Sequence, residues 1–367
     1  MFRVRFAAIA AVVLLVTASA FAITYQVGTC RQTLIIFPTI SAAVNGVPAG
    51  STIDICPGTY LEQVLIAKPL TLEEVPGVSG EVVIAVPPSG LTQTVNFWAG
   101  DFACQVLVQS AGPVNLSNLA VDGAGASNQD NVAGVVYLDS SGNAEHLSVR
   151  NQRGNFNAVG LLAVTSGPTP QTVTIRSSVI RGFNGIGVWA TSGDALVTTN
   201  LDSNTIHAQE TQLNWQTDVW YYYASGTIQS NQITGALTGV SVGYSSSVNV
   251  TQNYVTGLTN SAILWPLAIQ VWQSSASVTN NTIDAGTALG IFLGGLGYNS
   301  AIQHNTIGNS SGAVVGCDIA LGPPPASGFV VTSNTITDAA TGLQMPSGNT
   351  TAPNNYYAVA NATLPCT

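Results

Sequence analysis

The stretch SVNVTQNYVTG at residues 247–257 contains the pattern that decides the fold of this chain. An alternating apolar run leads to an asparagine, and a β-branched residue follows two positions later. The asparagine of this motif recurs at steps of 27, 22, 28, 24 and 29 residues, at Asn204, Asn231, Asn253, Asn281, Asn305 and Asn334. A unit that returns at a loose period of this length is typical of a solenoid.

The segments between these asparagines predict short strands. Alternating apolar and polar residues precede the asparagine at 248–253 and 277–281, and follow it at 239–242, 268–271 and 290–293. Runs of this kind separated by Gly, Asn and Ser are typical of strands and turns. Three strands fit into each repeat, so we predict an all-β solenoid in which three parallel sheets enclose an apolar core.

Composition supports one elongated body. Only 7% of the 367 residues are charged, whereas 46% are hydrophobic and 37 are glycine, which argues against long amphipathic helices. A repeat array grows by adding coils and needs no domain boundary.

The recurrent asparagines are predicted to be structural. Asparagine tolerates left-handed backbone angles, so it suits a corner between two strands. Stacked in register, each amide can donate to one neighbouring coil and accept from the other, which leaves no donor for a ligand.

The first residues resemble an export signal. Arg3 and Arg5 precede an apolar run, and small residues that fit a cleavage site follow near residues 18–22. We therefore predict a signal peptide at 1–22, a cap segment at 23–50, the solenoid at 51–350 and a tail at 351–367. The expected location is secreted or extracytoplasmic, in the periplasm or at the cell surface, with no membrane span after cleavage.

Five cysteines remain after the predicted signal. No CxxC pair or His/Cys cluster occurs, so we predict no metal and no cofactor. In an oxidising compartment disulfides are expected, and Cys30 with Cys56 and Cys317 with Cys366 are the pairs that would tie down the two ends. One thiol is left over because the number is odd.

The segment FPTISAAVNGVPAGSTIDICPGTYLEQVLIAKPLTLEE at residues 37–74 predicts a short capping helix at Thr39–Val44 and then strands at 51–56 and 62–66. This opening resembles that of secreted members of the right-handed parallel β-helix superfamily with the pectin lyase-like fold, pectin methylesterases among them. The resemblance implies a single-stranded right-handed parallel β-helix whose open first edge is covered by the helix. The catalytic motifs of its polygalacturonases, methylesterases and pectate lyases are missing from this sequence, so the resemblance implies the fold and no particular activity.

In that superfamily the exposed sheet forms the substrate groove. The predicted register places a row of aromatic and amide side chains on its outer face, namely Trp189, Tyr221, Tyr223, Gln270, Trp272 and Phe292. Aromatic faces stack on sugar rings while amides bond hydroxyl groups, so the row predicts glycan binding. The alternative is that these aromatics only cover apolar gaps between coils.

A second predicted column carries charge. The residue after the third-strand β-branched position runs Asp122, Arg150, Arg181, His207 through consecutive coils. Asp122 and Arg150 can pair, but two adjacent arginines would repel unless an anion lies between them. That anion would be a uronate or sulfate of an acidic polysaccharide, or else Glu145 or Asp202 of the chain itself.

The longest departure from the repeat, residues 207–223, collects ionisable and aromatic side chains. If the protein is an enzyme, Arg181 or His207 would be the base of a lyase, with Tyr221 or Tyr223 as proton donor, and Glu210 or Asp218 would be the carboxylates of a hydrolase.

Binding to a polysaccharide or cell-surface glycan through the exposed sheet is the function that the sequence favours. A polysaccharide lyase or glycoside hydrolase with a non-standard site, and a non-catalytic structural or adhesive solenoid, are the alternatives. The excess of 17 acidic residues over eight basic ones argues against nucleic acid as a partner.

Overall fold

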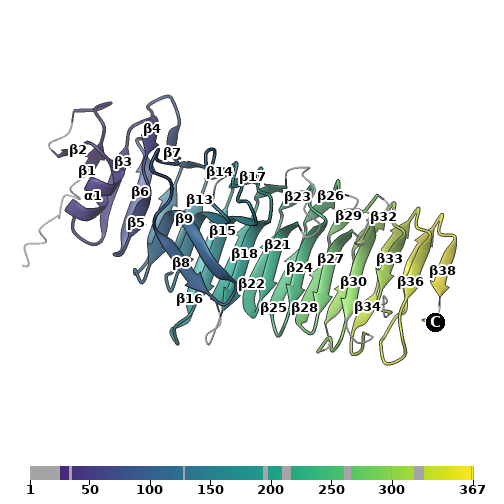
Figure 1. Cartoon of the computed structure of the whole chain (residues 1–367). Helices are drawn as coiled ribbons and strands as arrows, with labels where there is room; N and C mark the ends of the chain where they lie inside the picture. Colours follow the sequence, from purple (N-terminus) through teal and green to yellow (C-terminus); the bar gives the residue numbers. More distant parts are fainter. Residues whose placement is uncertain are drawn as a thin grey trace, which may run out of the picture.

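The computed structural model describes residues 25–32, 35–126, 129–192, 197–208, 216–259, 266–286, 288–298, 300–317, 326–364 and 366. Strands dominate these residues, and one helix, α1 (Ile40–Gly46), is present among them. The strands stack into an elongated solenoid (Figure 1). The predicted all-β right-handed parallel β-helix is confirmed.

Three sheets run along the axis, here called A, B and C. Sheet A contains β1 (Tyr25–Val27), β2 (Ile36–Phe37), β3 (Ser51–Ile55), β6 (Leu70–Glu74), β10 (Val114–Ser117), β13 (Gly142–Glu145), β16 (Gln171–Arg176), β19 (Val197–Asp202), β22 (Ala224–Gln229), β25 (Ser247–Thr251), β28 (Ser275–Thr279), β31 (Ala301–Gln303) and β34 (Val330–Thr332). Sheet B contains β4 (Gly58–Leu61), β7 (Val82–Ala85), β11 (Ala120–Asp122), β14 (Ser148–Arg150), β17 (Val179–Arg181), β20 (Thr205–His207), β23 (Gln232–Thr234), β26 (Tyr254–Thr256), β29 (Thr282–Asp284), β32 (Thr306–Gly308), β35 (Thr335–Thr337) and β37 (Asn355–Tyr357). Sheet C contains β5 (Val64–Ile66), β9 (Gly100–Gln109), β12 (Asn131–Leu138), β15 (Asn157–Thr165), β18 (Ile186–Ser192), β21 (Thr217–Tyr222), β24 (Thr238–Gly243), β27 (Leu267–Trp272), β30 (Leu289–Gly294), β33 (Gly312–Val315), β36 (Thr341–Gln344) and β38 (Asn361–Leu364), with β8 (Thr94–Phe97) paired to β9.

Each strand pairs in parallel with its counterpart one coil away, so like residues form columns. The β-branched residue of the repeat motif points inward from sheet B and is buried in every coil, as the column Val121, Val149, Ile180, Ile206, Ile233, Val255, Ile283, Ile307 and Ile336 shows. This stacking explains why the motif requires that residue type, because a branched side chain fills the narrow space between three sheets.

The recurrent asparagines form one buried hydrogen-bonded column at the corner between sheets A and B. The amide nitrogen of Asn253 donates to Oδ1 of Asn281 at 2.9 Å and to the carbonyl of Ile228 at 2.8 Å. The same Oδ1 of Asn281 accepts from the backbone N–H of Asn253 at 3.0 Å. These contacts repeat from Asn204 to Asn334 and end on Asn354.

One predicted reason for these asparagines is wrong. The left-handed backbone at this corner belongs to the preceding residue, as at Ser203 (φ 58°), Ser230 (φ 56°) and His304 (φ 57°), and not to the asparagine. The asparagine is required for its amide, which satisfies buried backbone groups of the turn.

The N-terminal end is closed by α1, as predicted. The Thr39 side chain accepts a hydrogen bond from the backbone N–H of Ala42 at 3.1 Å. The Glu62 carboxylate accepts from the N–H groups of Ile40 and Ser41, each at 2.8 Å, so the first turn of the helix is satisfied.

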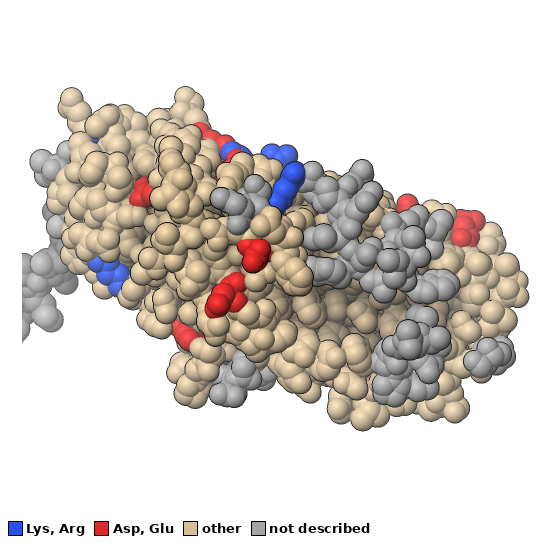
Figure 2. Space-filling model, viewed as in Figure 1, with Lys and Arg blue, Asp and Glu red and all other residues tan. Residues whose placement is uncertain are grey.

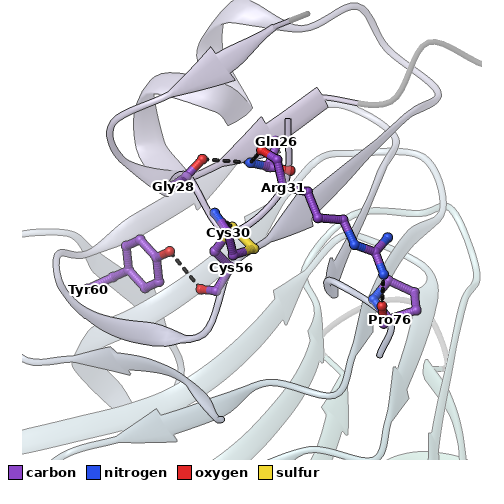
Figure 3. Close-up of a disulfide and its surroundings, with 7 residues drawn as sticks. All are labelled: Gln26, Gly28, Cys30, Arg31, Cys56, Tyr60 and Pro76. Carbon is purple, nitrogen blue, oxygen red and sulfur yellow. Dashed lines mark hydrogen bonds between the residues drawn. A yellow bond between two sulfur atoms is a disulfide. The ribbon is translucent and has the colours of Figure 1, made fainter. Parts of the chain in front are cut away.

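Both predicted disulfides are confirmed. Cys30 bonds to Cys56 beside the first coil, where the Tyr60 hydroxyl donates to the Cys56 carbonyl at 2.7 Å (Figure 3). Cys317 bonds to Cys366. Cys104 is the remaining thiol; it is buried, and burial raises its pKa to about 12.

The parallel pairing continues past residue 350, because β37 pairs with β35 and β38 pairs with β36. The predicted signal at 1–22 lies outside the described residues. Among the residues that are described, no helix has the length and apolarity needed to cross a bilayer.

Candidate functional site: an aromatic groove on sheet C

The outer face of sheet C carries a column of large side chains through the middle coils. Successive Cα partners in this column are Leu162, Trp189, Trp220, Ser241, Gln270, Phe292 and Val315. In Figure 2, most red and blue atoms lie over the N-terminal half of the molecule, and the described residues of the later coils carry few of them. None of the residues in this column of sheet C is charged.

The prediction that Tyr221 faces outward is wrong. Tyr221 pairs with Ala190 and Val242 in an inward column, is fully buried, and its hydroxyl donates to the Thr199 carbonyl at 2.7 Å. Burial raises the pKa of this phenol above its ordinary range. Trp220 and Tyr222 occupy the outward positions instead.

Trp189 and Phe292 point outward but are not accessible, which corrects two further predictions. Trp189 is 1% exposed because β8 folds across the outer face of sheet C and places Phe97 with its ring 5.3 Å away. Phe292 is 4% exposed and packs in a separate apolar cluster with Leu289 and Val315. Both side chains pack in apolar clusters on the outer face of sheet C and are not accessible to a ligand.

A groove of about 340 Å³ opens between Trp220 on β21 and Trp272 on β27. Its floor is β24, which contributes the small residues Ser241 and Gly243. Apart from its chain neighbours, a Cβ added to Gly243 would approach no described residue closer than the Trp272 carbonyl at 3.9 Å, so a small side chain would fit at this position. The walls are two coils apart, roughly 10 Å or twice the strand spacing. We call this hollow the sheet C groove.

Polar groups in the sheet C groove are few and oriented. The Ser241 hydroxyl donates to Oε1 of Gln270 at 3.2 Å, which leaves the amide nitrogen of Gln270 as a donor with no partner among the described residues. Thr217 and Thr238 also line the groove, and none of the described lining residues is charged. Flat apolar walls with isolated hydrogen-bonding groups suit a neutral, polar ligand with apolar faces.

The sheet C groove thus contains two of the predicted binding residues, Gln270 and Trp272. Tyr223 is 39% exposed and lies beside the groove, its ring 5.9 Å from that of Tyr244. Trp220 belongs to the 207–223 segment that was expected to form a groove wall, but it was not assigned to the outward row, and sequence reasoning missed Tyr244. Reading Val219 and Tyr221 as the inward pair would have placed Trp220 outward, because strand residues alternate.

The predicted catalytic residues that the structure describes, Arg181, His207 and Asp218, do not converge on this groove. Arg181 and His207 are Cα partners at outward positions on sheet B, and Nδ1 of His207 lies 2.8 Å from the Thr234 hydroxyl. Glu210 lies outside the described residues.

Asp218 is buried inside the solenoid and is not a groove residue, which corrects its prediction as an accessible carboxylate. Its carboxyl group accepts backbone N–H bonds from Ala208 at 3.1 Å and Ala236 at 3.4 Å. Neighbouring coils have Gly187 and Gly239 in the equivalent places. Burial raises the pKa of Asp218 well above its ordinary range, although these two hydrogen bonds lower it. The residue joins backbone segments of two coils.

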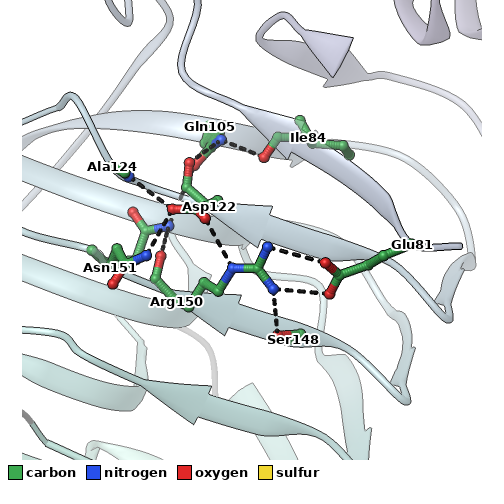
Figure 4. A network of polar contacts seen from close by, with 9 residues as sticks. Glu81, Ile84, Gln105, Asp122, Ala124, Ser148, Arg150 and Asn151 are labelled. Carbon is green, nitrogen blue, oxygen red and sulfur yellow. Dashed lines mark hydrogen bonds and ion pairs between the residues drawn. The ribbon is translucent and has the colours of Figure 1, made fainter. Parts of the chain in front are cut away.

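The charged column on sheet B is neutralised largely by the chain itself. Arg150 donates to Asp122 at 2.9 Å and holds Glu81 through two bonds of 2.8 and 3.1 Å (Figure 4). Burial tends to raise the pKa of Asp122, but the bonds from Arg150 and Asn151 lower it below its ordinary value. The predicted pairing of Asp122 with Arg150 is confirmed.

Glu145 and Asp202 are not the counterions of this column. They lie on sheet A beside Arg176, at 4.0 and 3.8 Å. The two carboxylates at Arg150 remove the reason to place an external anion between Arg150 and Arg181. The described residues contain no cluster of three or more His, Cys, Asp or Glu side chains placed to hold a metal.

The fold and the groove together define a right-handed parallel β-helix with an aromatic-lined hollow on one sheet. The profile of the family described as "Right handed beta helix region" matches residues 169–361, more than half of the chain. The chain therefore belongs to the right-handed β-helix family.

Two solved structures of one protein have a similar fold. Native GH136 lacto-N-biosidase from Eubacterium ramulus is similar with a TM-score of 0.65 at 10% identity, over 92% of this chain and 68% of that chain. Its selenomethionine derivative gives 0.63 at 11% identity over the same shares. The A-module of the Azotobacter vinelandii mannuronan C-5 epimerase AlgE6 gives 0.46 at 14% identity, over 89% and 94%. No curated protein sequence matches the chain.

Proposed function

We propose that the protein binds a neutral glycan in the sheet C groove. The observation that carries this proposal is a groove with Trp220, Tyr244 and Trp272 around a small-residue floor, beside Gln270, whose amide nitrogen has no hydrogen-bond partner among the described residues. Sugar rings have apolar faces that stack on aromatic side chains, and their hydroxyl groups accept bonds from amides.

The absence of charge among the described lining residues supports a neutral ligand over an acidic one. An acidic polysaccharide would need unpaired cations along its path, whereas Arg150 is already bound by Asp122 and Glu81. Nucleic acid is disfavoured further by the excess of acidic residues in the chain.

Binding is favoured over catalysis because the ionisable candidates that are described lie elsewhere. Arg181 and His207 are on sheet B, and Asp218 is in the interior. A lyase or hydrolase and a purely structural or adhesive solenoid are separate outcomes of the experiment below. The solved GH136 structures are of a lacto-N-biosidase, and at 10–11% identity they support the fold and not this activity for the present chain.

We also propose that the protein is exported and acts outside the cytoplasm. Two disulfides support an oxidising compartment. The basic start and apolar run of the first residues support a signal sequence.

The test is binding of the protein to an array of neutral and acidic glycans, compared with Trp272→Ala. We expect neutral glycans to bind and the variant to lose about tenfold in affinity. An aromatic contact contributes about 1.4 kcal/mol to the binding free energy, which corresponds to a tenfold change in affinity. Phe156→Ala is the matched control, because Phe156 is a 71% exposed aromatic outside the sheet C groove.

Two results would contradict the proposal: no glycan bound by the wild-type protein, or equal binding by Trp272→Ala. The same glycans are incubated with the protein and assayed for new reducing ends and for the absorbance of new double bonds. Product formation would identify an enzyme, and neither binding nor product would favour the structural role.

A further inference from the structure

An arm from an early coil reaches the edge of the sheet C groove. Strand β8 pairs antiparallel with β9, from Thr94 opposite Ala103 to Phe97 opposite Gly100, and lies off the path of the three sheets. β12, β15 and β18 separate β9 from β21 in sheet C. The tip of the arm nevertheless contacts side chains of β18 and β21, so it crosses the outer face of the coils between them (Figure 1).

Trp98 at the tip of this arm is held in a fixed place. Its indole N–H donates to the Thr191 hydroxyl at 3.2 Å, and its ring meets that of Trp189 edge-on at 5.6 Å. The adjacent Phe97 is 9% exposed and anchors the arm in the cluster over sheet C. A side chain fixed in this way loses little conformational entropy when a ligand binds to it.

Trp98 continues the aromatic surface of the groove. Its ring stacks on Tyr222 at 4.8 Å with the planes 29° apart, Tyr222 contacts Tyr244 at 4.5 Å, and Tyr244 contacts Trp272 at 4.8 Å. We call these four residues the aromatic ledge. The Trp98 side chain is still 53% exposed despite these contacts. A large aromatic group fixed by hydrogen bonding yet half open to water is typical of a binding surface.

Resting on the proposed neutral-glycan function of the sheet C groove, we propose that Trp98 forms a second subsite and that the ligand is an oligosaccharide chain. The groove takes one part of the chain, and the aromatic ledge carries the following sugars toward the arm. The ledge spans three successive ring contacts, which is more than a single sugar ring stacked on Trp272 would use. Affinity should therefore increase with chain length.

The experiment measures binding of cello- and chito-oligosaccharides of one to six residues, together with the equivalent lengths of any other series that binds on the array. For the wild-type protein, affinity should rise with length. Trp98→Ala should bind the mono- and disaccharide like the wild type and lose about tenfold on the longer members. Trp98→Tyr keeps a stacking ring and should retain most of the rise, whereas Trp98→Leu keeps apolar cover over Trp189 without a flat face and should lose it.

Trp98→Leu could bind every oligosaccharide length more weakly by the same factor, or bind every length as tightly as the wild type. Either result would overturn the second subsite and leave the groove proposal intact. Wild-type binding that does not increase with length would overturn it as well. Failure of the wild type to bind any length would instead reject the glycan function, and the subsite with it. Thermal unfolding of each variant shows whether a loss of binding comes from misfolding. If Trp98→Ala is misfolded, Trp98→Leu replaces it in the comparison.

Discussion

Trp189 and Trp220 are neighbours in one column on sheet C, yet one is core and the other lines a groove. Their rings stack 5.0 Å apart with the planes 7° from parallel, and both side chains leave the sheet on the same side. Trp189 is 1% exposed, whereas Trp220 is only half-buried. The sheet gives both side chains the same orientation. Their exposure differs because the arm covers Trp189 and ends at Trp220.

This comparison shows that the role of an outward side chain on a solenoid depends on what lies over it. The residues that bury Trp189 include Phe97, which is more than ninety positions away in the sequence. The covered part of the column contributes to stability. The open part of the sheet, beyond the arm, exposes aromatic side chains that a ligand can contact.

The largest expected effect is on the covered side. Trp189→Ala should lower the free energy of unfolding by about 3–5 kcal/mol, because it removes a fully buried ring and leaves a cavity beneath the arm. Urea denaturation followed by circular dichroism measures this. Trp272→Ala is the matched change on the open side, and we expect it to cost about 1 kcal/mol. Equal losses in the two variants would contradict a difference in stability contribution between the covered and the open part of the column.

The scaffold beneath the open side gives the next largest effect. Asn281→Ala should cost about 1–3 kcal/mol, because it leaves the amide nitrogen of Asn253 and the backbone N–H of the same residue without their shared acceptor. Thr282→Ala, at the exposed position that follows, is the control and should change stability by less than about 0.5 kcal/mol. An unchanged melting temperature in Asn281→Ala would refute a stabilising column.

A pH-dependent effect is expected from Asp218, which lies on the strand next to the covered part. Its pKa is raised in the folded state above the unfolded value of about 3.9, so the folded protein holds a proton that the unfolded chain releases. The stability contribution is therefore present below about pH 4 and is lost as pH rises toward the folded pKa. Asp218→Asn, which retains an acceptor for the Ala208 N–H, should become progressively more stable relative to wild type as pH rises. Parallel stability curves for the two proteins between pH 4 and 8 would contradict this.

Much of the fold could be predicted because the residues concerned act locally and repeatedly. The asparagine motif and the β-branched residue after it mark the same corner in coil after coil, and Thr39 begins a helix through its own side chain. The pairing of Asp122 with Arg150 followed from the register alone. Glu81, the second partner of Arg150, was missed because it precedes β7 at a turn that the repeat does not specify.

The site was only partly predictable. Gln270 and Trp272 lie in regular strands, where alternation assigns them outward. Tyr221 was misplaced because three adjacent tyrosines follow a stretch of sequence without the repeat motif, and hydrophobicity does not indicate which of them faces the core. The role of Trp98 depends on an arm folding over distant coils, and no local pattern encodes that contact.

The asparagine column makes the coils interchangeable. Every amide from Asn204 to Asn334 donates in the same direction along the axis to the amide oxygen of another asparagine. The hydrogen bond between neighbouring coils is therefore the same throughout the column. Removal of a whole coil would bring together two amides that already fit each other. Repeat number can therefore change in such a chain by recombination within the motif, without a new contact having to arise.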